Sequence, residues 1–155
     1  FISGQEVNWS RQLFSLSCYA HMLARALDAQ AWGTIKCLVW YQGESDTGVF
    51  PHPQYMTSQW ELFERFRQRI GIRDLPIIYT QLGANPHDLD PANNNYPNWL
   101  NMQNMQAWGA LCDPRIKMVT ANDNSVVADG LSVHKTAAAQ ITLGHQYADC
   151  LMTMN

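Results

Sequence analysis

The chain has 155 residues, of which 46% are hydrophobic and 15% charged, and its formal net charge is −3. This length and this share of apolar residues fit one folded domain and exclude a disordered chain. The sequence has no basic block, which argues against nucleic-acid binding, and its apolar runs are too short to span a membrane. We therefore expect one domain over residues 1–155.

Helical and strand-like segments alternate along the chain. Apolar residues recur at helical spacing in some segments, whereas others are short apolar runs rich in β-branched residues. In chain order, we predict a helix over 13–29, a strand over 35–41, a helix over 54–70 with Trp60, Phe63, Phe66 and Ile70 along one stripe, a strand over 75–82, a helix over 98–111 with Asn98 as its N-cap, a strand over 116–121 and a helix over 136–152.

This alternation predicts an α/β fold, with a three-layer α/β/α arrangement around a parallel sheet. The strand over 35–41 is almost continuously hydrophobic, which predicts burial on both of its faces. Three strands are few for such a sheet, so we expect at least one more strand from missing sequence or from a partner chain. The start Phe1-Ile2-Ser3-Gly4 lacks Met, and we expect a domain that is incomplete at its N-terminus.

A polar motif follows the strand predicted over 35–41. Gln42, Gly43, Glu44 and Asp46 stand at its carboxyl end, where open α/β sheets bind ligands. The Gln42 amide could donate a hydrogen bond to the oxyanion of an acyl transfer, or it could satisfy loop carbonyls. Glu44 and Asp46 could form a carboxylate pair for glycoside chemistry, or they could hold the loop.

A second motif, Asp129 to His134, precedes the last predicted helix. A histidine in such a loop acts as a general base when a carboxylate holds its other ring nitrogen, and Asp129 is the candidate partner. The alternative is a solvated histidine beside a turn-forming Asp-Gly pair. No serine in the chain sits on a glycine elbow, so we expect the nucleophile to lie outside this sequence.

The four cysteines are Cys18, Cys37, Cys112 and Cys150, and none of them forms a C-x-x-C pair. A zinc knuckle is therefore not expected. Cys37 lies in an apolar strand and is predicted to be a small buried side chain. Cys18 and Cys150 lie in predicted helices near opposite ends of the chain, and the sequence leaves a disulfide between them open.

The segment Trp40-Tyr41-Gln42-Gly43-Glu44-Ser45-Asp46 closely resembles the W-x-Q-G-E-x-[ND] block of one branch of the SGNH hydrolase superfamily, the sialate O-acetylesterases and carbohydrate acetylesterases. The residues that lead into it, 18–23 and 33–40, are similar to the helix and strand that precede this block in the family. The tail over 129–144 resembles the family's final block and helix. The resemblance covers the C-terminal portion of the domain.

The resemblance implies a flavodoxin-like SGNH hydrolase fold and deacetylation of acetylated sugars through a serine acyl-enzyme, without a metal or cofactor. His134 would be the base, Asp129 would orient it, and Gln42 would take the oxyanion role. Gly43, Glu44 and Asp46 would support the site.

An N-terminal segment or a second chain would supply the serine. The resemblance also favours an extracellular or secretory compartment. The alternative function is a catalytically inactive SGNH-like module that binds glycans or serves in assembly.

Overall fold

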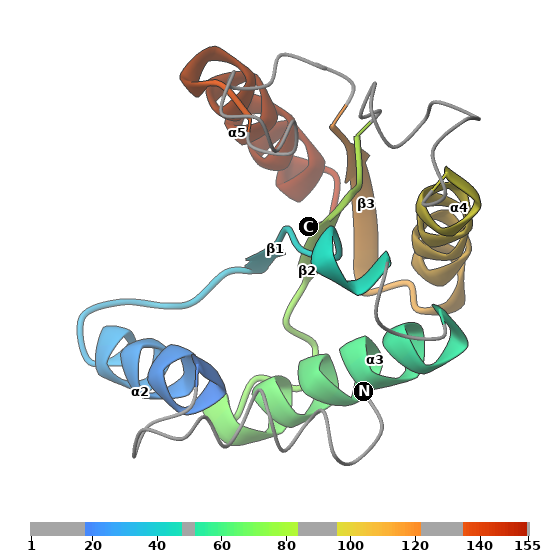
Figure 1. The fold of residues 1–155 in the computed structure, drawn as a ribbon. Coiled ribbons are helices and arrows are strands. Elements are labelled where there is room, and N and C mark those ends of the chain that lie inside the picture. The colour runs from blue at the N-terminus through green and yellow to red at the C-terminus, as the bar shows by residue number, and fades with distance from the viewer. Residues whose placement is uncertain (1–17, 48–51, 84–95, 122–134, 155) are drawn as a thin grey trace.

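The computed structural model describes residues 18–47, 52–83, 96–121 and 135–154. None of the helices in these ranges is long and apolar enough to cross a lipid bilayer. Along the chain, the elements are α2 (Cys18–Gln30), β1 (Leu38–Trp40), the short 3-10 helix η1 (Ser45–Thr47), α3 (His52–Ile70), β2 (Ile77–Gln81), α4 (Tyr96–Cys112), β3 (Ile116–Thr120) and α5 (Ala137–Met152) (Figure 1).

The three strands form one parallel sheet in the order β1-β2-β3. Successive side chains of a strand point to opposite faces, and β2 shows which helices cover each face. Ile77 and Tyr79 pack in one core cluster with Phe63 of α3, whereas Thr80 bonds the hydroxyl of Tyr147 on α5. The sheet therefore lies between α5 and the pair α3 and α4, which confirms the predicted α/β fold (Figure 1).

The apolar stripe predicted for the helix over 54–70 is the part of α3 that faces the core. Phe63, Phe66 and Ile70 are all buried, and Trp60 is half-buried. The ring of Phe63 meets that of Trp40 edge to face, with centroids 5.9 Å apart. Full burial of one such side chain contributes about 1.5–3 kcal/mol. Phe63 therefore fixes α3 against the sheet, whereas Phe66 and Ile70 fix it against α2.

The strand over 35–41 was expected to be buried on both faces, and this prediction is wrong for β1. The observed strand is shorter, and Val39 is 42% exposed. Within the described residues β1 pairs with β2 alone, so Val39 lies at the edge of the sheet, where it lines a cavity beside α5. The expected double-sided burial is found in β2, which lies between two strands and is covered by α3 and α4 on one face and by α5 on the other.

The structure also differs from the predictions for the N-cap of α4 and for the burial of Cys37. Helix α4 begins at Tyr96, so Asn98 lies inside it and is not its N-cap. Pro97 explains the earlier start, because the fixed φ of proline suits the first turn of a helix. All four cysteines are free thiols, with Cys18 exposed and Cys37 only half-buried.

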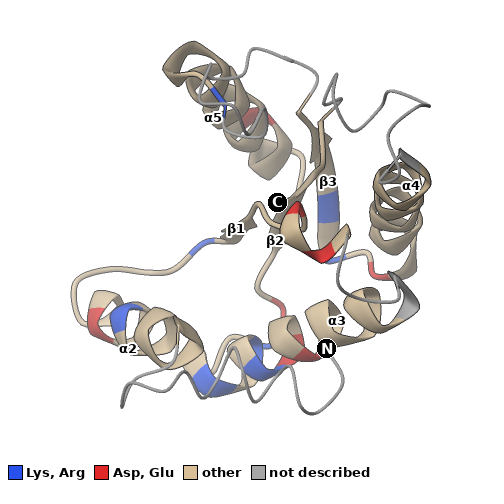
Figure 2. Cartoon of the chain, in the orientation of Figure 1, with Lys and Arg blue, Asp and Glu red and all other residues tan. Residues whose placement is uncertain are grey.

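A cluster of charges joins α3 to the segments that enter β2 and β3. The charged residues of α3 lie in its C-terminal half (Figure 2). Among them, Arg67 is 1% exposed, and its Nε donates to the Leu75 carbonyl at 3.0 Å. Its Nη1 bonds Glu64 at 2.5 Å and Asp113 at 3.2 Å. Arg115 Nη2 bonds the same two carboxylates, at 2.8 and 2.7 Å, so each buried charge is paired.

This cluster predicts a pH dependence of stability. Burial alone would raise the pKa of Asp113, but hydrogen bonds from the side chain and backbone of Arg115 lower it to about 2, from an ordinary 3.8. A carboxyl whose folded pKa is depressed stabilises the fold above its unfolded pKa and loses that contribution as pH falls through the folded value. Between about pH 5 and pH 2, Asp113 should thus account for a loss of about 1–2 kcal/mol in unfolding free energy.

Urea denaturation between about pH 5 and pH 2 tests whether Asp113 causes this loss of unfolding free energy. Asp113→Asn should lower the unfolding free energy at neutral pH and flatten its fall toward acid pH. Asp149→Asn is the matched control, because Asp149 is exposed on α5. An unchanged pH slope in Asp113→Asn would remove this carboxyl from the linkage.

Candidate functional site

The polar motif from Gln42 to Asp46 forms a sharp turn at the carboxyl end of β1. Gly43 has φ of 135°, a conformation that side-chain-bearing residues rarely adopt. A Cβ at this position would also stand 3.2 Å from both Gln106 Nε2 and the Tyr55 hydroxyl. The Asp46 N–H bonds the Gly43 carbonyl at 3.1 Å, which closes the turn and starts η1. Only glycine fits at this position, so the turn requires the glycine that the sequence has there.

The side-chain amide of Gln42 is held from both ends. Its Nε2 donates to the Asp46 carboxylate, and its Oε1 lies 2.9 Å from the Tyr55 hydroxyl. Burial raises the pKa of Asp46, and the hydrogen bond from Gln42 opposes that rise. An amide nitrogen carries two N–H groups, and among the described residues only Asp46 accepts from this one. The second N–H of Gln42 therefore has no acceptor among the described residues.

Helix α4 fixes the backbone of the turn through Gln106, which is fully buried. Its Nε2 donates to the Gln42 carbonyl at 3.3 Å, and its Oε1 accepts from the Leu82 N–H at 2.8 Å. One turn earlier, Gln103 Nε2 donates to the carbonyls of Leu82 at 2.7 Å and Gly83 at 3.2 Å. Two glutamines thus satisfy the backbone that leaves β1 and β2.

Sequence reasoning did not identify Tyr55, Gln103 or Gln106 as parts of this arrangement. A signal was present, since Gln103 and Gln106 are one helical turn apart and flank the apolar residue Met105. Polar side chains on the core-facing side of a helix must find partners, which makes them candidates for such contacts. Tyr55 gives no comparable signal, because a buried tyrosine near a helix start is common in cores.

A cavity of about 420 Å³ lies beside the turn. Burial, followed by the negative charge of Glu44, raises the pKa of Tyr41, so its phenol is neutral at physiological pH. Lys135, which precedes α5, is only 9% exposed and faces the same space. The cavity thus combines apolar walls with a carboxylate, an ammonium and two phenols; its lining residues are Val39, Tyr41, Glu44, Lys135, Gln140, Leu143 and Tyr147.

The structure brings together four of the predicted site residues, Gln42, Gly43, Glu44 and Asp46, but not the others. His134 and Asp129 lie outside the described residues, and their roles stay predictions. Asp46 bonds Gln42, as the loop-holding interpretation of this carboxylate requires, whereas Glu44 lines the cavity. In the described ranges, no group of three or more His, Cys, Asp or Glu side chains is placed to hold a metal ion.

Tyr55→Phe should destabilise the turn. The change removes the hydroxyl that contacts Gln42 and leaves a buried oxygen without that donor, at a cost of about 1–3 kcal/mol in unfolding free energy. The control is Tyr19→Phe, because the buried Tyr19 hydroxyl has no hydrogen-bond partner in the described part of the chain. Urea denaturation of both variants measures the difference, and equal effects would contradict the proposed importance of the Tyr55 contact.

Comparison with solved structures shows a similar fold. The chain is similar in fold to a protein from Arabidopsis thaliana with a solved X-ray structure, at a TM-score of 0.68 and 22% identity. The match covers 94% of this chain and 55% of that protein, so the chain spans about half of its length. No curated protein matches the sequence.

A family match extends over nearly the whole sequence. The family described as carbohydrate esterase, sialic acid-specific acetylesterase, matches residues 2–153. Those residues include β1, the Gln42 turn and all the strands and helices described above. The chain therefore belongs to the carbohydrate esterase family of sialic acid-specific acetylesterases.

Proposed function

We propose that the chain is part of a carbohydrate O-acetylesterase, a serine-dependent enzyme that removes acetyl groups from sugars. The family match over residues 2–153 carries this proposal. The turn at Gln42 and the adjacent cavity of about 420 Å³ support it, because a cavity of this size can take a sugar with its acetyl group. The activity is proposed for the whole protein, since this chain spans about half of the matched Arabidopsis structure.

Gln42 would stabilise the oxyanion that forms when the acetyl carbonyl is attacked. Its contacts with Asp46 and Tyr55 hold the amide in one orientation, and its second N–H has no acceptor within the described ranges. Such a donor is effective when it is fixed before the reaction begins, because no reorganisation is then needed in the transition state. The Gly43 turn that supports it is in turn held by α4 through Gln106.

His134 would act as the base and Asp129 would orient it. A serine from an N-terminal segment or a second chain would attack the acetyl carbonyl as His134 takes its proton, and the sugar hydroxyl would leave with that proton. Water activated by His134 would then release acetate and restore the serine. The position of Lys135 supports this role, because the residue directly after His134 lines the same cavity as Glu44.

Turnover of p-nitrophenyl acetate by the complete protein tests these roles. His134→Ala should lower kcat by about 10²–10⁴-fold, the usual contribution of a general base. Gln42→Ala should lower kcat by about 10²–10³-fold with little change in KM, as expected for an oxyanion donor. His145→Ala is the matched control, because His145 is exposed on α5. Full turnover by His134→Ala would exclude this histidine from the mechanism.

A catalytically inactive glycan-binding or assembly module is the second candidate. The two bonds that hold the Gln42 amide favour it, because a purely structural amide would make the same contacts. Intact mass and fluorophosphonate labelling of the native protein separate the two functions. A labelled second segment with turnover supports the esterase, whereas a lone unlabelled chain of 17.6 kDa without turnover supports the module.

A further inference from the structure

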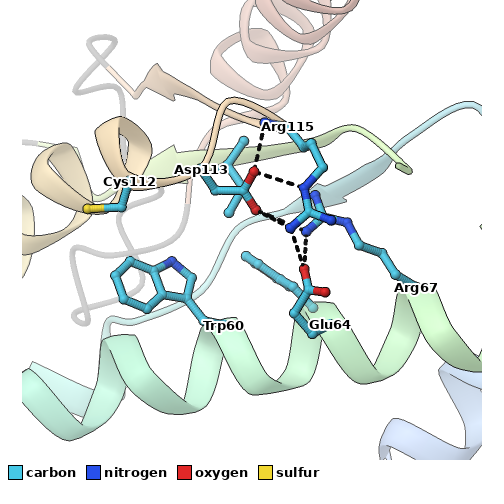
Figure 3. A pocket seen from close by; sticks show the side chains of 8 residues that line it. Trp60, Glu64, Arg67, Cys112, Asp113 and Arg115 are labelled. Carbon is cyan, nitrogen blue, oxygen red and sulfur yellow. Dashed lines mark hydrogen bonds and ion pairs between the residues drawn. The ribbon is translucent and has the colours of Figure 1, made fainter. Parts of the chain in front are cut away.

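Asp46 is a buried carboxyl that no lysine or arginine bonds within the described ranges. It is 6% exposed, and its carboxylate accepts from the neutral amide of Gln42. Asp113 differs, because two arginines bond it at the amino end of the sheet (Figure 3). Burial raises the pKa of Asp46, whereas for Asp113 burial is outweighed by hydrogen bonds from Arg115, which lower the pKa. A buried carboxyl with a raised pKa beside a candidate site is itself a candidate for a functional role.

The side-chain amide of Gln42 can occupy its place in two directions, which differ by a half-turn that exchanges Nε2 and Oε1. Two groups contact this amide from opposite ends. The Tyr55 hydroxyl lies 2.9 Å from Oε1, and the Asp46 carboxylate accepts from Nε2. Whether each of these groups requires the oxygen or the nitrogen of the amide depends on the protons that it carries.

Tyr55 favours the amide oxygen. Burial, followed by the negative charge of Asp46, raises the pKa of Tyr55, so its phenol keeps its proton. The phenol oxygen accepts from Gln59 Nε2, one turn later in α3, at 3.3 Å. The phenol proton therefore points to Gln42, whose Oε1 and backbone carbonyl are the acceptors within reach. With the amide reversed, its Nε2 would compete with Gln59 for the phenol oxygen.

The charge of Asp46 makes this preference strict. An ionised carboxylate accepts hydrogen bonds and donates none, so it requires the amide nitrogen. With the amide of Gln42 reversed, Oε1 would face the carboxylate, and two acceptors opposed in a buried place are costly. A protonated carboxyl has one O–H donor and one carbonyl acceptor, so it can pair with the amide in either direction. The ionisation of Asp46 thus determines whether the amide has one direction or two.

The elements packed on η1 leave the proton of Asp46 as the variable. Tyr55 is the titratable side chain by which α3 contacts Gln42, and it keeps its proton. Helix α4, which also packs on η1, has no charged residue along its length. Glu44 is the other carboxylate of the turn, and its negative charge also raises the pKa of Tyr55.

We propose that Asp46 is a positioning residue whose ionised carboxylate holds the Gln42 amide in the direction that an oxyanion donor requires. When Asp46 takes up a proton, the amide can turn over, and its oxygen then stands where the nitrogen was. The second N–H leaves the site, and an acceptor replaces the donor that an oxyanion needs. The catalytic part of this inference rests on the proposed function, whereas the direction of the amide does not.

Nuclear Overhauser effects (NOEs) in NMR spectra of the full chain test the direction without any turnover. The Gln42 side-chain N–H protons should give weak NOEs to the Tyr55 ring at about pH 7.5 and stronger ones at about pH 4, because Nε2 then lies beside the phenol. Asp46→Asn is neutral at both pH values and should give the stronger NOEs at both. Asp149→Asn, an exposed control on α5, should behave as the native chain. NOEs that do not change with pH in the native chain, or that change equally in Asp46→Asn, would overturn the proposal.

Turnover of p-nitrophenyl acetate by the complete protein tests the catalytic part. At about pH 7.5, Asp46→Asn should lower kcat about two- to tenfold with unchanged KM, because the amide is then reversed in part of the molecules. In a Gln42→Ala background the same change should leave kcat as it is, since no amide remains to be positioned. An equal effect of Asp46→Asn in both backgrounds would overturn the positioning role. A native protein without turnover would contradict the esterase function alone, since the NOE test needs no substrate.

Discussion

The backbone groups that leave the carboxyl end of the parallel sheet need hydrogen-bond partners, and α4 supplies them with two glutamine side chains. Gln106 satisfies the carbonyl of Gln42 and the N–H of Leu82, and Gln103 satisfies the carbonyls of Leu82 and Gly83. Each of these groups, if left buried and unpaired, would cost about 1–3 kcal/mol. The turn at Gln42 is therefore tied to a core helix and keeps one conformation.

This constraint makes a structural role of Gln42 compatible with the catalytic role proposed for it. Gln42 is held by Tyr55 and Asp46, which alone would describe a structural amide. The same contacts also fix the direction of its remaining N–H, and a fixed donor is what an oxyanion site requires. The two interpretations of Gln42 left open by the sequence are thus compatible, because a donor must be held in place before it can act.

The two ends of the sheet are held by different chemistry. Amides, a tyrosine hydroxyl and the Asp46 carboxyl form the network at the carboxyl end, whereas two arginines and two carboxylates join the elements at the amino end. Burial raises the pKa of Asp46, and Glu44 and Lys135 are the charged residues that line the adjacent cavity. The charged network is self-balanced and borders a second cavity, of about 160 Å³, and no described residue accepts from Arg67 Nη2 or Trp60 Nε1. Each end of the sheet therefore has its own cavity with its own kind of polar group.

The sequence by itself determined the fold class and most of the elements. The alternation of apolar runs and amphipathic helices predicted the parallel sheet, and the stripe of α3 faces the core as its spacing indicates. These features could be predicted because the hydrophobic periodicity within one segment shows which side of that segment is buried. The polar motif after β1 was also predicted from the sequence, and the structure shows that Gly43 makes it a turn.

Only the tertiary structure decided which strands and side chains those segments contact. The runs that form β1 and β2 have similar composition, but β1 has one neighbouring strand among the described residues and β2 has two, so Val39 is exposed while Ile78 is buried. The contacts of Gln106 with Gln42 and of Arg67 with Asp113 join residues far apart in the sequence. No local pattern encodes such pairs, because the free energy of a buried polar group depends on the partner that the fold brings to it.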